Sequence, residues 1–144
     1  MHPIKRSTMI LIGLLVAHIQ PVLAHEQAGP LAAAGSPIAH YKVRCFDDGN
    51  GTPAGLLFNI RASKSSKKTL GVTDTVSKDG QSTTVTDPKS GDAKASDYGY
   101  LAQGPGDYSV DIKKSTSVRA AVIYAMEYHC ETAAGAHTGT DISR

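Results

Sequence analysis

The sequence predicts an all-β protein, a small antiparallel β-sandwich or barrel of about six to eight strands with one disulfide. Three observations support this prediction. Apolar and polar residues alternate with the two-residue period of half-buried strands, and turn-forming residues separate the alternating runs. The only two cysteines, Cys45 and Cys130, each lie on the apolar side of such a run.

The first two strands are predicted on either side of a dense turn sequence. In residues 39–46 every second side chain is apolar, and residues 56–62 repeat this pattern. The sequence D-D-G-N-G-T-P between them, residues 47–53, is rich in residues that favour tight turns. We therefore expect the two runs to pair as a β-hairpin.

The middle of the chain, residues 63–97, is polar and gives a weaker pattern. Short runs of threonine and valine at 69–75 and 82–86 predict two edge strands, joined by a Lys-Asp-Gly turn at 78–80. Scattered lysines suit exposed edges, where charge discourages association with other sheets. Residues 87–97 are predicted to form a loop.

The C-terminal third gives the clearest strand signal. Residues 98–101 lead into a Gly-Pro-Gly turn at 104–106, and residues 108–112 then alternate cleanly. The longest predicted strand, residues 119–131, carries apolar side chains on both faces, which is typical of a central strand. We expect it to lie near the first strand, because each of these two strands contains one cysteine.

Residues 1–24 have the three parts of a secretory signal peptide. Lys5 and Arg6 form a basic start, residues 9–17 form an apolar run, and small residues precede a cleavage position after Ala24. The apolar run is shorter than the roughly 20 residues that span a membrane. We therefore expect Sec-dependent export to the periplasm or the medium, and no integral membrane segment after leader removal.

The mature chain is predicted to have three parts. Residues 25–38 are small and aperiodic, which predicts a flexible N-terminal segment. Residues 39–132 are expected to form the β-sandwich domain, and residues 133–144 a polar C-terminal tail.

The net charge expected after leader removal argues against some classes of binding partner. Loss of Lys5 and Arg6 with the leader reduces the 15 basic residues to 13, which equals the number of acidic residues. A neutral chain without a basic stripe argues against nucleic acid. An unknown protein or small ligand is therefore the expected partner.

Cys45 and Cys130 are predicted to form a structural disulfide. Exported proteins meet an oxidising compartment, where an even number of cysteines favours pairing. A metal-binding pair or a reactive thiol is the alternative, but the C-x-x-C spacing of redox motifs is absent from the sequence.

His25 would become the first residue after cleavage at the predicted position. An N-terminal histidine offers Cu(II) both its amine and its ring nitrogen, and a second histidine can complete the site. Lytic polysaccharide monooxygenases and periplasmic copper-carrying sandwiches resemble this chain at that residue alone. The resemblance implies copper as a cofactor and His40, His129 or His137 as second ligand, whereas the alternative is a disordered tail that begins with histidine.

A second metal hypothesis places His40 and His129 side by side on one sheet surface. Both lie on polar faces of strands that the cysteines would bring together, and Glu127 shares the face of His129. Two imidazoles and a carboxylate suit a divalent metal. The alternative is an ordinary polar sheet face with cross-strand pairs.

Asp47, Asp48 and Asn50 concentrate oxygen atoms in one turn and are candidate calcium ligands. They depart from the twelve-residue helix-loop-helix pattern, because Phe58 stands where that pattern has glutamate. A tight turn needs the same residue types, which is the alternative explanation.

No catalytic residues are predicted. The sequence contains no G-x-S-x-G, no H-E-x-x-H and no phosphate-binding glycine loop. We therefore expect a non-catalytic, exported binding or accessory protein that needs no cofactor. A copper-binding protein that uses His25 and a periplasmic inhibitor of a wall-degrading enzyme are the two alternatives.

Two longer segments carry family resemblances. The sequence G-P-G-D-Y-S-V-D-I-K, about residues 104–113, resembles the closing strands of bacterial pre-peptidase C-terminal domains. The sequences Y-K-V-R-C-F-D-D-G-N-G-T-P-A and Y-H-C-E-T, with G-A-H-T-G-T-D after them, are similar to uncharacterised secreted proteobacterial β-sandwich proteins. Both resemblances imply a disulfide-linked sandwich, and neither implies an enzyme.

Overall fold

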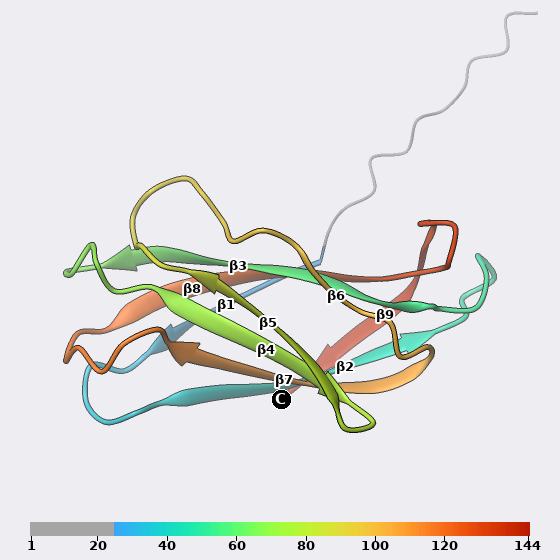
Figure 1. The fold of residues 1–144 in the computed structure, drawn as a ribbon, viewed down its shortest axis with the longest axis horizontal. Helices are drawn as coiled ribbons and strands as arrows, with labels where there is room; N and C mark the ends of the chain where they lie inside the picture. The colour runs from blue at the N-terminus through green and yellow to red at the C-terminus, as the bar shows by residue number, and fades with distance from the viewer. Residues whose placement is uncertain (1–24) are drawn as a thin grey trace, which may run out of the picture.

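The computed structural model describes residues 25–144, which form nine antiparallel strands and, over that range, no helix (Figure 1). The all-β prediction is confirmed, although two strands were not predicted. The strands are β1 (His25–Leu31), β2 (Ile38–Phe46), β3 (Gly55–Ser65), β4 (Val72–Lys78), β5 (Gln81–Asp87), β6 (Gly99–Leu101), β7 (Gly106–Lys114), β8 (Val122–Glu131) and β9 (His137–Ser143).

The predicted signal peptide lies outside the described residues. Within residues 25–144, no helical segment has the length and apolar character that a membrane crossing requires.

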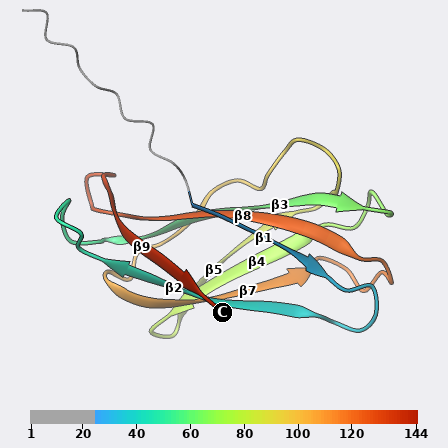
Figure 2. The ribbon, with the colours of Figure 1, turned by 180° about the vertical axis from the view of Figure 1, so that it is seen from behind.

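The strands form one curved sheet that folds over into two layers (Figures 1 and 2). Their order is β5-β4-β7-β2-β9-β8-β3-β6, and β1 is added beside β8. Strand β9 connects the layers, because it pairs with β8 at its start and with β2 further along. The two ends of the sheet also meet, since the Thr83 hydroxyl of β5 donates a 3.2 Å hydrogen bond to the Tyr100 carbonyl of β6. The sheet is therefore nearly closed, like a barrel.

The core lies between the layers and follows the alternation in the sequence. Every second residue of β2 is buried, and β8 is buried on both faces over much of its length. The outer face of β8 is partly covered because Tyr98, which precedes β6, reaches over it. The largest fully buried side chains are Tyr108, Tyr124, Phe58, Leu31, Leu56, Ile60, Leu70, Ile112 and Met126.

The predicted disulfide between Cys45 and Cys130 is confirmed, and it joins β2 to β8 with a Cα–Cα distance of 5.5 Å. These two strands are not hydrogen-bonded to each other, because the start of β9 passes between them. The bond therefore links the two layers at the point where β9 crosses. A disulfide is compatible with an extracytoplasmic location.

The predicted hairpin between residues 39–46 and 56–62 is wrong. Strand β2 pairs with β7 and β9, whereas β3 pairs with β8 and β6, so the two strands lie in different layers. Alternation showed which side chains are buried, but it does not specify the partner strand. The two predicted threonine-rich strands are present as β4 and β5, and the turn between them contains Asp79 and Gly80 with positive φ. The prediction that both are edge strands is wrong for β4, because it pairs with β5 on one side and with β7 on the other.

The prediction of a flexible segment at residues 25–38 is also wrong over its first half. Residues 25–31 form β1, which pairs along β8 and buries Leu31. Gly29 and Pro30 give this segment a weak strand propensity. Proline is tolerated here because β1 is an edge strand, so one side of its backbone needs no ladder partner.

The predicted polar tail at residues 133–144 contains a strand. Residues 137–143 form β9, in which Thr138, Gly139 and Thr140 are all buried. Their burial follows from the crossing of β9 between the layers, which surrounds the strand on both faces.

We expect Gly139→Ala to destabilise the protein by about 1 kcal/mol, because a Cβ at this position would lie 2.4–2.7 Å from ring carbons of Phe46 and would force this exposed ring off the strand. The exposed substitution Ser143→Ala on the same strand is the control and should leave stability unchanged. Urea unfolding measures both variants. Equal urea midpoints for Gly139→Ala and the parent protein would contradict the close packing of Gly139 in β9 against Phe46 in β2.

Candidate functional site

The β8–β9 hairpin brings several polar side chains together. The Thr132 N–H donates to the Ala136 carbonyl at 2.8 Å, and the Ala136 N–H donates to the Thr132 hydroxyl at 3.1 Å. Gly135 lies between them with a φ of 78°, which favours glycine. The hairpin sets His137 opposite Glu131 in the ladder. Their side chains therefore stand on the same face of the sheet.

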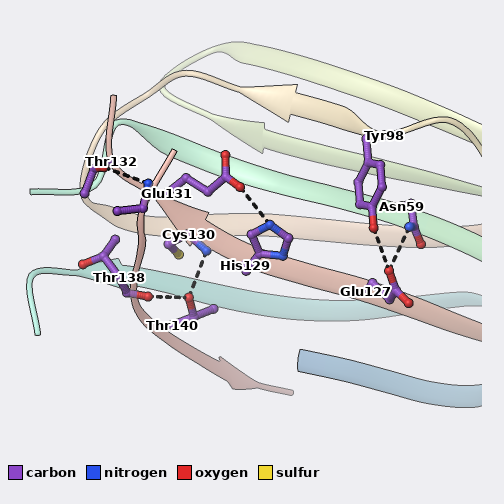
Figure 3. A network of polar contacts seen from close by, with 10 residues as sticks. Asn59, Tyr98, Glu127, His129, Cys130, Glu131, Thr132, Thr138 and Thr140 are labelled. Carbon is purple, nitrogen blue, oxygen red and sulfur yellow. Dashed lines mark hydrogen bonds and ion pairs between the residues drawn. The ribbon is translucent and has the colours of Figure 1, made fainter. Parts of the chain in front are cut away.

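His129, Glu131 and His137 form a compact group that we call the His–Glu–His cluster. One potential ligand atom from each residue lies within 4.8 Å of the other two. The two imidazole rings are stacked, with centroids 4.1 Å apart and an interplanar angle of 19°. The Nε2 atom of His129 lies 2.9 Å from the Glu131 carboxylate (Figure 3). Two imidazoles and a carboxylate are a donor set that Zn(II) and Cu(II) both accept.

One ring nitrogen of the buried His129 side chain forms no hydrogen bond with the rest of residues 25–144. Only 7% of the residue is exposed, and its Nδ1 atom is buried without a hydrogen-bond partner. Buried polar atoms in native proteins are nearly always paired, so an exception calls for a physical explanation such as a bound ion.

The second ring is held in the form that binds metals. Burial lowers the pKa of His137 below its usual value of 6.5, and His129 and His25 lower it further, whereas the Glu131 charge opposes them. The net effect keeps the imidazole neutral at pH 7. A neutral ring has a free lone pair for a metal ion.

Glu127, one of the predicted ligands, is not part of the cluster. Its Oε2 atom accepts hydrogen bonds from the Asn59 amide at 3.0 Å and from the Tyr98 hydroxyl at 2.9 Å (Figure 3). The hydrogen bond to this carboxylate raises the pKa of Tyr98 above its usual range. Glu127 thus ties β3 and the chain before β6 to β8, and Glu131 is the carboxylate next to the histidines.

The predicted pairing of His40 with His129 is wrong. His40 is exposed on β2, and its Nδ1 atom lies 2.7 Å from Asp111 on β7. The disulfide does bring β2 and β8 together, but it does so at Cys45, and β9 lies between the strands there. His40 is five positions away along β2 and faces a different strand.

His25 is the first residue of β1 and pairs with Tyr128, with the two ring centroids 5.7 Å apart. Paired residues in an antiparallel ladder point to the same face. The His25 ring therefore lies on the Tyr128 side of β8, whereas the side chain of His129 points to the opposite side.

The predicted calcium ligands hold the turn between β2 and β3. Asp47 Oδ1 accepts hydrogen bonds from the backbone N–H groups of Gly49 at 2.8 Å and Gly51 at 3.2 Å. Asp48 Oδ1 accepts from both the backbone and the side-chain nitrogen of Asn50. These bonds are typical of an Asx-stabilised turn. Calcium binding at this turn stays a prediction.

Sequence reasoning missed the role of Glu131 and left His137 as one option among three. The missing element was β9, which alone places His137 beside β8. A signal for it exists, because Thr138, Thr140 and Ile142 alternate after Gly135, a residue suited to a hairpin turn.

No protein-family model, curated protein or solved structure matches this chain. The resemblances to pre-peptidase C-terminal domains and to secreted proteobacterial sandwiches therefore stay predictions.

Proposed function

We propose that this protein is an exported, non-catalytic β-sandwich that binds a late first-row transition metal, Cu(II) or Zn(II), through the His–Glu–His cluster. The observation that carries the proposal is the convergence of one donor atom from each of His129, Glu131 and His137 within 4.8 Å. The signal-like residues 1–24 and the disulfide support export. The lack of hydrolase motifs in the sequence supports a binding role.

The distances suit metal binding after small side-chain rotations. Bonds of about 2.0–2.1 Å from a metal to imidazole nitrogen or carboxylate oxygen place neighbouring donors roughly 3–4 Å apart. Donor atoms within 4.8 Å need to move by only about an ångström to reach that separation. Cu(II) should bind more tightly than Zn(II), because it stands higher in the stability order for such ligands.

The backbone under the cluster is fixed by hydrogen bonds and by the disulfide at Cys130. The Cys130 N–H donates to the Thr140 hydroxyl at 2.9 Å, which in turn donates to the Thr138 carbonyl at 3.1 Å (Figure 3). The Thr138 hydroxyl donates to the Phe46 carbonyl at 2.8 Å. Ligands on rigid strands lose little freedom when a metal binds, which favours affinity.

We expect the mature protein, residues 25–144, to bind one equivalent of Cu(II), and His137→Ala to weaken binding by about tenfold or more. His137 is half-buried near the end of the hairpin, so this variant should fold. His40→Ala is the matched control, because it removes an exposed histidine far from the cluster. Competition with a chromophoric chelator measures the dissociation constants, and circular dichroism checks the fold.

A mature protein without Cu(II) or Zn(II) binding would refute the proposal. Unchanged affinity in folded His137→Ala would also refute it, since the metal would then bind elsewhere. A loss in His40→Ala equal to that in His137→Ala would also refute the proposal, since His40 lies outside the cluster and bonds to Asp111.

A further inference from the structure

We propose that removal of the leader after Ala24 completes the metal site, because it places the free α-amine of His25 beside the His–Glu–His cluster. Cu(II) would then bind more tightly to the mature protein than to its precursor. This inference rests on the proposed function, and it adds that processing controls metal loading.

The topology brings the start of β1 next to the cluster. Strand β3 pairs along the whole of β8, so it occupies one edge of that strand. Both β1 and β9 must therefore share the other edge, where β1 pairs up to Tyr128 and β9 begins pairing at Cys130. His129 is the single β8 residue between these two ladders. The backbone nitrogen of His25 therefore lies at this edge of β8, next to the backbone of His129 and between the ladders of β1 and β9.

The chemistry of this nitrogen changes on cleavage. In the precursor it belongs to a peptide bond, whose lone pair is delocalised and does not bind a metal readily. In the mature protein it is a primary amine, and Cu(II) can displace its proton and bind the lone pair. Three protein ligands leave one position of a four-coordinate metal open, and the amine can fill it.

In an N-terminal copper site of the usual kind, the amine and the ring of the same histidine both bind the metal. The position of the His25 ring excludes that arrangement here. The ring packs on the Tyr128 side of the sheet, away from the face that carries His129. The donor is therefore the amine. The His25 side chain itself should contribute little to affinity.

Four proteins test the inference by Cu(II) competition titration. They are the mature chain, a chain that keeps residues 19–24 before His25, the mature chain with an acetylated amine, and mature His25→Ala. We expect the extended and acetylated chains to bind about tenfold or more weakly, and His25→Ala to bind within about threefold of the mature chain. The acetylated chain adds no residues, so it tests the need for a free amine even if the six added residues of the extended chain disturb β1.

The outcomes separate this inference from the proposed function. Equal affinity of the mature, extended and acetylated chains, with His137→Ala still weakened, overturns the inference and leaves the metal site intact. A loss in His25→Ala as large as that on acetylation overturns the assignment of the donor to the amine. Absence of binding in all forms refutes the proposed function itself.

Discussion

Replacing Asp74 by asparagine should stabilise the protein by roughly 4 kcal/mol at pH 7 and have little effect at pH 4. Asp74 lies on β4 between Val85 of β5 and Ile112 of β7, and it is fully buried. Neither of its carboxylate oxygens has a hydrogen-bond partner. Burial, with a further contribution from Asp111, raises the pKa of Asp74 from 3.8 to about 8.

The direction of the pH dependence follows from this shift. The folded protein holds a proton on Asp74 up to about pH 8, whereas the unfolded chain releases it above about pH 4. The contribution of Asp74 to the free energy of unfolding is therefore at its full value below pH 4. It falls by about 1.4 kcal/mol per pH unit as the pH rises from 4 towards 8. Asparagine has nearly the same shape and does not titrate, so Asp74→Asn should lack this decline.

Urea unfolding at several values between pH 4 and pH 8 measures the effect. Asp87 provides a matched control, because it is also a buried aspartate but accepts hydrogen bonds from the Ala62 N–H at 2.7 Å and the Lys89 N–H at 3.1 Å. Asp87→Ala should destabilise the protein by about 1–3 kcal/mol. Parallel pH profiles for Asp74→Asn and the parent protein would show that Asp74 is not buried as described.

The second large effect concerns the disulfide. The double variant Cys45→Ala and Cys130→Ala should lose roughly 4 kcal/mol of stability, because the bond closes a loop with a sequence separation of 85. Thermal unfolding should show a melting temperature lower by roughly 15 °C or more. The loss arises mainly in the unfolded chain, which becomes free to expand.

Reduction of the unmodified protein is the control for this prediction, since it breaks the bond without changing the packing volume at either cysteine. The reduced protein and the double variant should melt at similar temperatures. A double variant as stable as the oxidised parent would contradict the expected contribution of the loop.

Most of the fold could be predicted from the sequence because burial leaves a local pattern. The alternation of Tyr41, Val43 and Cys45 marks β2, and the apolar residues on both faces of 122–131 mark β8 as central. The partner of each strand could not be predicted, since pairing depends on contacts between distant segments. The segments around Pro30 and Gly139 were missed because neither has the composition of a strand, and each is held in place by its neighbours.

The candidate site was predictable only in its chemistry. His129 was identified as a ligand from its residue type and its polar face. Its partners were not, because Glu131 and His137 meet it only when β9 turns back along β8. Glu127 has the same chemistry as Glu131 in the sequence, and the hydrogen bonds from Asn59 and Tyr98 are what distinguish the two carboxylates.

The place of β9 in the sheet has a consequence for how the chain reaches its native state. The seven residues of β9 join β8 to β2, which precedes β9 by about 90 residues, and most contacts among residues 25–144 are likewise distant in sequence. Such topologies fold slowly, and their incomplete forms expose strand edges. The sheet therefore cannot close until residues 137–143 are available to pair with both β8 and β2.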